Sequence, residues 1–249
     1  MIDSHTHLDV CKPPDEELVR RARELGVRRI ATIGMNDASI ERAVAAANSY
    51  EEVVAIVGRH PNEAEGFQAH DIEPIERAAE DPRVRAIGET GLDYYRDYAP
   101  RDDQMRAFES HIALAKRCGL PLVIHSRAAE DDTLRVLSEQ ADGVTVIMHC
   151  FSMPDRVGEC VDRGWLCSFA GNVTYPNAAD LQEAARAVPD QLLLVETDAP
   201  YLSPQAVRGK PNEPANVVRT AEFLAELRGV PYAELEETIE RNAARVFGW

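Results

Sequence analysis

The chain has 249 residues, with 27 lysines and arginines against 43 acidic residues, which gives a formal net charge of −16 at pH 7. Such a charge repels nucleic acids and anionic membranes from the surface as a whole, so a polyanion would need a local cluster of basic residues. The length suffices for one large hydrophobic core, and we expect a single domain over residues 1–249.

The five cysteines are scattered along the chain and form no CxxC pair. This spacing argues against a disulfide framework and against a thiolate zinc site. No uninterrupted apolar run approaches the roughly 20 residues of a membrane span, and no signal-peptide pattern opens the sequence. We therefore expect a soluble, cytoplasmic protein that does not act at a membrane, and no obligate protein partner is evident.

Short apolar or β-branched runs alternate along the chain with longer segments of helical period. We predict strands at 2–7, 29–33, 53–58, 84–88, 122–125, 144–149, 165–169 and 192–195. Between them, residues such as Met105, Phe108 and Ile112 recur at the spacing of one helix face. This alternation predicts parallel βα units, and eight of them in a chain of this length predict a single (β/α)8 TIM barrel.

The alternative fold is an open doubly wound sheet, which alternates in the same way. No GxGxxG motif follows the first predicted strand, and the count of eight favours closure into a barrel. After the eighth strand, we predict one helix over 216–228 that stops at Gly229, and another that begins near Pro231 and ends near Phe247. The barrel should thus carry extra C-terminal helices.

Polar residues that can bind metals stand at or just beyond the ends of the predicted strands. His5 and His7 form an HxH pair, which alone is most often two exposed or hydrogen-bonded histidines. The remaining candidates follow later strands: Glu89, His125, His149 and Asp198. Because the C-terminal ends of barrel strands converge on one rim, we expect these groups to form a metal site there. Imidazole with carboxylate suits zinc, manganese or magnesium.

Seven motifs extend this pattern over nearly the whole chain. They are DSHTHLD at 3–9, GRHP at 58–61, GETGLDYY at 88–95, PLVIHSR at 121–127, HCFS at 149–152, ETDAPYL at 196–202 and GKPNEPANV at 209–217. Together they resemble the TatD-type metal-dependent deoxyribonuclease family, within the amidohydrolase-like barrel superfamily. Two departures, Met153 after HCFS and Ala128 after HSR, stand where the family usually has glycine and aspartate, and they concern substrate fit more than metal binding.

The resemblance implies two divalent metal ions, zinc, magnesium or manganese. One ion would be held by His5, His7, Glu89 and Asp198, and the other by Glu89, as a bridge, with His125 and His149. Such sites suit phosphodiester hydrolysis because paired ions activate a shared water and neutralise the phosphate oxygens. We predict Glu89 and Asp198 as catalytic groups. Asp198 could accept the proton of the water, or it could be a structural ligand only.

Arginines and tyrosines in the predicted loops suggest the substrate. Arg96, Arg127 and Tyr95 are predicted substrate contacts, because arginines and aromatic rings serve phosphate binding and base stacking in single-stranded nucleic acids. Such aromatics can equally pack the loops. His60, in GRHP, is predicted to contact substrate or to support a ligand, with a satisfied core histidine as the alternative.

The predicted function, in line with the family, is 3′-5′ exonucleolytic hydrolysis of single-stranded DNA or of another phosphodiester. Two alternatives stand beside it. One is a carbonyl hydrolase that acts on an amide, a lactone or an aminoacyl ester with the same binuclear site. The other is a metal-binding or scaffold protein without catalysis, which a complete ligand set disfavours.

Overall fold

The computed structural model describes residues 1–96 and 98–248; residues 97 and 249 of the predicted domain lie outside the described part. The strands are β1 (Ile2–Thr6), β2 (Arg29–Gly34), β3 (Val53–Val57), β4 (Val84–Asp93), β5 (Leu122–Arg127), β6 (Val146–Met148), β7 (Leu166–Phe169) and β8 (Leu193–Val195). The α-helices are α1 (Asp15–Glu24), α2 (Asp37–Ser49), α3 (Glu73–Ala78), α4 (Arg101–Cys118), α5 (Glu130–Gln140), α6 (Val157–Asp162), α7 (Ala179–Ala187), α8 (Val217–Arg228) and α9 (Tyr232–Phe247).

The eight strands form one sheet in the order β1-β2-β3-β4-β5-β6-β7-β8, alternating with helices along the chain. This is the (β/α)8 barrel, and the predicted fold class is confirmed. Strands such as β3, with the sequence VVAIV, are buried at every position, as expected when a parallel sheet is covered on both faces. β4 is longer than predicted, because its pairing with β5 continues to Asp93 and Arg127.

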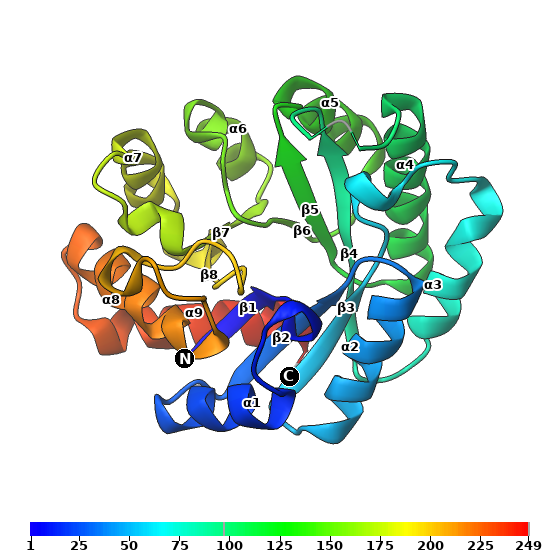
Figure 1. Ribbon diagram of the computed structural model, residues 1–249. Coiled ribbons are helices and arrows are strands. Elements are labelled where there is room, and N and C mark those ends of the chain that lie inside the picture. The colour runs from blue at the N-terminus through cyan, green and yellow to red at the C-terminus, as the bar shows by residue number, and fades with distance from the viewer. Residues whose placement is uncertain (97, 249) are drawn as a thin grey trace. The chain divides into compact units, whose positions relative to one another are not determined.

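The described chain divides into two compact units. The first comprises residues 1–32, 50–53 and 149–249, and the second comprises residues 33–49 and 54–148. In the first unit, a parallel bridge between Thr6 and Ala199 joins the end of β1 to the segment after β8. In the second unit, α4 lies alongside β4 (Figure 1).

The two C-terminal helices end the chain as the sequence predicts. α8 stops at Gly229, whose φ of 68° is the left-handed conformation that glycine adopts without strain. Pro231 immediately precedes the first residue of α9. The apolar face of α9, with Leu235, Ile239 and Ala243 at helical spacing, is buried, and α9 packs against β8 and β1.

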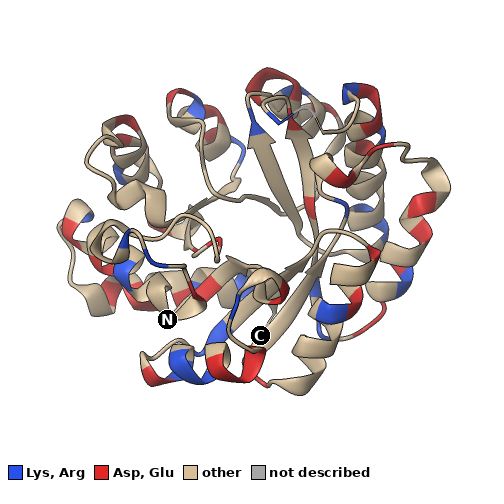
Figure 2. Ribbon diagram, viewed as in Figure 1, with Lys and Arg blue, Asp and Glu red and all other residues tan. Residues whose placement is uncertain are grey.

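Charged residues are mainly in the helices and loops, while the strands contain few of them (Figure 2). None of the described helices is both long enough and apolar enough to cross a membrane.

His111, on α4, ties this helix to the segment that follows β3. Its ring is fully buried; Nε2 accepts the backbone N–H of Arg59 at 2.9 Å, and Nδ1 lies 2.6 Å from the carbonyl oxygen of Ala107. Since Nε2 is an acceptor, the neutral ring carries its proton on Nδ1 and donates it to Ala107. Burial lowers the pKa of His111 to about 4, with Arg59 acting in the same direction and the Ala107 bond opposing it. His111 therefore stabilises the fold in its neutral form.

We predict that His111 makes stability fall as the pH drops below about 6.5. In that range the unfolded chain binds a proton that the folded chain, with a pKa of about 4 at His111, still excludes. His111→Gln removes the titrating group, so the stability advantage of the wild type over this variant should shrink by about 2 kcal/mol between pH 7.5 and pH 5. Urea unfolding at both pH values measures it.

The control is His70→Gln, at an exposed histidine. The change between the two pH values should be larger for His111→Gln than for this variant. If the two changes were equal, burial of a neutral His111 would not be the cause of the acid sensitivity.

Candidate metal centre

Two backbone hydrogen bonds join the end of β1 to the segment after β8. The N–H of Asp198 donates to the carbonyl oxygen of His5 at 2.9 Å, and the N–H of His7 donates to that of Ala199 at 2.8 Å. The carboxylate of Asp3 faces Thr197 and accepts both its N–H, at 2.8 Å, and its hydroxyl, at 2.6 Å. These bonds bring the histidines of β1 beside Asp198.

His7 and Asp198 lie within ion-pair distance in the first unit. His7 Nε2 is 3.3 Å from Asp198 Oδ1, and His5 Nε2 is 3.9 Å from the same oxygen. Both histidines are almost completely buried, whereas the Asp198 side chain remains 14% exposed. Three predicted ligands are thus neighbours, and the carboxylate is the one of them that solvent reaches.

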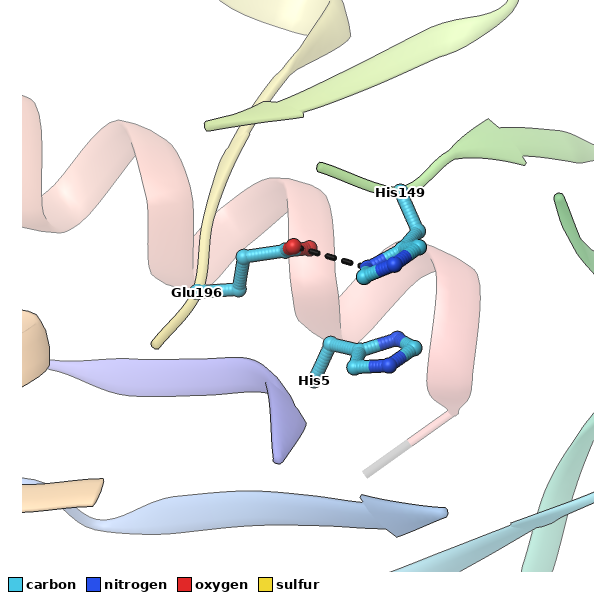
Figure 3. Close-up of side chains that lie close together, drawn as sticks. All are labelled: His5, His149 and Glu196. Atoms are coloured by element: carbon cyan, nitrogen blue, oxygen red, sulfur yellow. Dashed lines mark ion pairs between the residues drawn. The ribbon is translucent and has the colours of Figure 1, made fainter. Parts of the chain in front are cut away.

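A cluster of His5, His149 and Glu196 occupies the same unit (Figure 3). The rings of His5 and His149 stack with their centroids 3.6 Å apart, and His149 Nδ1 lies 2.8 Å from Glu196 Oε1. That oxygen also accepts the N–H of Cys150 at 2.9 Å. Glu196 was not among the predicted ligands; its position in ETDAPYL, two residues before Asp198, was the sequence signal that could have identified it.

The second unit holds a cluster of His60, Glu89 and His125. Glu89 Oε1 lies 2.8 Å from His125 Nδ1 and 3.4 Å from His60 Nε2. The Glu89 side chain is only 3% exposed, so its charge is largely removed from water. A buried carboxylate of this kind requires a cation or hydrogen-bond donors beside it.

The hydrogen bonds of His60 distinguish it from a metal ligand. Its Nδ1 accepts the backbone N–H of Asn62 at 3.0 Å. A neutral imidazole has one acceptor and one donor nitrogen, so the proton of His60 is on Nε2, which faces Glu89. His60 therefore presents an N–H toward Glu89 rather than a lone pair. Such a donor suits a contact to substrate or to a metal-binding carboxylate, as predicted, and not a bond to a metal ion.

Asp93 is a second carboxylate near His125 that the sequence analysis did not identify. Its Oδ2 lies 3.3 Å from His125 Nε2, while its Oδ1 accepts the N–H groups of Tyr95 and Arg96. Burial alone would raise the pKa of Asp93, but the hydrogen bonds from His125 and from Arg96 hold it well below its usual range. An ionised Asp93 can fix the orientation of the His125 ring, as carboxylates behind metal-binding histidines do.

Apart from His60, the residues of both clusters fit a divalent metal ion. In each cluster, one nitrogen or carboxylate oxygen per residue lies within 4.8 Å of the others, and all are buried except His125, which is partly exposed. Oε2 of Glu196 is buried and accepts no hydrogen bond from the described residues. Imidazole and carboxylate are the donors that zinc and manganese accept, and such a buried oxygen is available to a cation.

The other predicted substrate residues, Tyr95, Arg96 and Arg127, lie at the ends of β4 and β5. The guanidinium of Arg127 stacks over the ring of Tyr95 at 4.0 Å, and Arg96 donates to the hydroxyl of Tyr98 at 3.3 Å. The two tyrosines are 65% and 62% exposed, respectively. More than half of each tyrosine is therefore open to solvent.

Comparison with known proteins identifies the family. The family model of TatD-related DNases matches residues 2–248. The metal-dependent hydrolase YabD of Bacillus subtilis is 38% identical over 251 residues, covering 99% of this chain and 98% of that protein. A protein of Klebsiella pneumoniae, named 3′-5′ ssDNA/RNA exonuclease TatD, is 32% identical over 240 residues, covering 94% and 91%.

A solved structure gives the same result. The crystal structure of YjjV, a TatD homologue from Escherichia coli, superimposes with a TM-score of 0.92 at 30% identity, covering 100% of this chain and 98% of that one. The family resemblance drawn from the motifs is confirmed. The chain belongs to the TatD-related DNase family and is a metal-dependent hydrolase.

Proposed function

We propose that this hydrolase cleaves phosphodiester bonds and shortens single-stranded DNA from its 3′ end, with divalent ions held by its buried histidines and carboxylates. The observation that carries the proposal is the pair of buried clusters, one with His5 and His149 and the other with Glu89 and His125, in a chain of this family. The Klebsiella relative, named as an ssDNA/RNA exonuclease, supports the choice of a nucleic-acid substrate.

The cofactors that we propose are two divalent ions of zinc, manganese or magnesium. The family pattern implies His5, His7 and Asp198 as ligands of one ion, His125 and His149 as ligands of the other, and Glu89 as a ligand of both. When bound, such ions lower the pKa of a water molecule and neutralise charge on the phosphate oxygens.

The side chains have distinct proposed tasks in the reaction. Asp198, whose Oδ1 lies 3.3 Å from His7 Nε2 and which retains contact with solvent, is the proposed acceptor of the proton from the attacking water. The proton on His60 Nε2 can be donated to a phosphate oxygen, while Asn62 holds the other side of this ring. Asp93 holds the ring of His125.

Recognition of the strand is the proposed role of the exposed tyrosines and their arginines. Tyr95 and Tyr98 offer aromatic faces to unstacked bases, and Arg96 and Arg127 offer charge to phosphates. These local cations overcome the repulsion expected from a net charge of −16. A duplex, with its bases already stacked on one another, cannot use the tyrosine faces.

The metal assignment predicts that Glu89→Ala removes more metal than the replacement of any single histidine. A carboxylate that serves both ions affects both when it is lost, whereas each histidine serves one. Metal content should be measured on purified variants that were stripped with a chelator and reloaded with Mn²⁺, with the exposed His70→Ala as control. If Glu89→Ala retained two ions per chain, Glu89 would not be shared.

The substrate assignment predicts faster shortening of a single-stranded oligonucleotide than of a blunt duplex. Arg127→Ala should lower kcat/KM on the oligonucleotide about 10-fold, since it removes a phosphate contact and the partner of Tyr95. A small activated phosphodiester does not reach Arg127, and its hydrolysis should change less than about 2-fold. Raised salt should reduce oligonucleotide cleavage by the wild type more than by the variant.

The control for this experiment is Arg77→Ala, at an exposed arginine on α3. It should leave both rates unchanged. Equal losses on both substrates in Arg127→Ala would contradict a role in strand recognition. Efficient hydrolysis of an ester or amide, without hydrolysis of any nucleic acid, would instead identify a carbonyl hydrolase.

A further inference from the structure

Asn212, between β8 and α8, is a buried side chain whose hydrogen bonds surround the segment that carries Asp198. Its side-chain amide donates to the carbonyl oxygen of Thr197 at 2.9 Å and to that of Tyr201 at 2.7 Å. Asn212 is 2% exposed. The two acceptors flank Asp198 in the sequence, so one side chain holds both ends of the turn that contains it.

The oxygen of the same amide is also engaged. It accepts the backbone N–H of Glu213 at 3.1 Å and the side-chain amide of Asn216 at 3.0 Å. Every hydrogen-bonding group of the Asn212 side chain is thus used, and its orientation is fixed. A fully satisfied buried network of this kind specifies one local arrangement.

The segment needs such support because its backbone is strained. Asp198 has a φ of 53° and Leu202 a φ of 50°, in the left-handed region that non-glycine residues rarely occupy. Such conformations persist only when the surrounding contacts determine them. Asp198 is held by its N–H bond to the carbonyl of His5. Asn212 supplies further contacts through its bonds to the carbonyl oxygens of Thr197 and Tyr201.

We infer that Asn212 is a positioning residue, which holds the segment from Thr197 to Tyr201 so that the carboxylate of Asp198 faces His7. The inference rests on the proposed function of Asp198 as a metal ligand and proton acceptor. Asn212 acts through the main chain on both sides of Asp198.

The chain supplies a matched control at the opposite end of the same strand. Asn242, on α9, is 3% exposed, and its side-chain amide also donates to two carbonyl oxygens, those of Asp190 at 2.6 Å and of Leu193 at 2.8 Å. Asn212 and Asn242 therefore share burial and bonding, but Asn242 holds the start of β8. A general loss of stability should be common to both, and an effect on Asp198 should be specific to Asn212.

The experiment compares Asn212→Ala with Asn242→Ala. Both variants should unfold at lower temperature in the metal-free state, by similar amounts. Mn²⁺ titration of the stripped proteins should show affinity weakened at least 10-fold in Asn212→Ala and changed less than 2-fold in Asn242→Ala. The kcat for a small phosphodiester should fall at least 10-fold in Asn212→Ala alone, with KM little changed, because the proton acceptor is displaced.

Equal changes in Mn²⁺ affinity in the two variants would overturn the inference. So would an Asn212→Ala protein that is less stable but keeps the Mn²⁺ affinity and kcat of the wild type. If Asn212→Ala does not fold, Asn216→Ala serves in its place, because it removes only the support of the Asn212 oxygen. In Asn216→Ala, Mn²⁺ affinity should fall about 3-fold, and an unchanged affinity would overturn the inference.

A wild type that binds Mn²⁺ without hydrolysing a phosphodiester would contradict the proposed function. The comparison of Mn²⁺ affinities would still test the role of Asn212.

Discussion

The buried carboxylate of Asp3 is the constraint that places the histidines of β1 beside Asp198. Asp3 is fully inaccessible to solvent, and both of its oxygens accept hydrogen bonds from Thr197. Burial raises the pKa of Asp3, and the two Thr197 bonds oppose this shift. Because a buried carboxylate without donors is strongly destabilising, these bonds fix β1 against the segment after β8. His5, His7 and Asp198 become neighbours as a result.

Buried polar side chains hold the main chain or a ring beside candidate site residues elsewhere in the molecule. Asn212 holds the turn around Asp198, His111 holds the backbone at Arg59 before His60, and Asp93 holds the ring of His125. Strand ends supply the candidate ligands, and these hydrogen bonds fix the local backbone or ring orientation beside them. Such rigidity favours metal binding, since ligands that are already oriented lose less conformational freedom when the ion binds.

The sequence predicted the fold and the candidate ligands because both follow from local patterns. Apolar runs of strand length and helical periodicity alternate eight times, and the HxH pair and the later histidines stand at strand ends. Supporting residues could not be predicted in this way. Glu196 contacts Cys150 across 46 residues, and Asn242 contacts Leu193 across 49, so only the folded chain brings such partners together. The extension of β4 to Asp93 likewise depends on its pairing with β5.

The central claim is that the buried imidazoles and carboxylates are ligands of divalent ions, and anomalous diffraction tests it most directly. Crystals grown with Mn²⁺ would be measured on both sides of the manganese absorption edge. We predict anomalous peaks within coordination distance of His5 or His149 and a carboxylate, and of Glu89 with His125. A catalytically active, Mn²⁺-loaded crystal with no peak at these side chains would contradict the account.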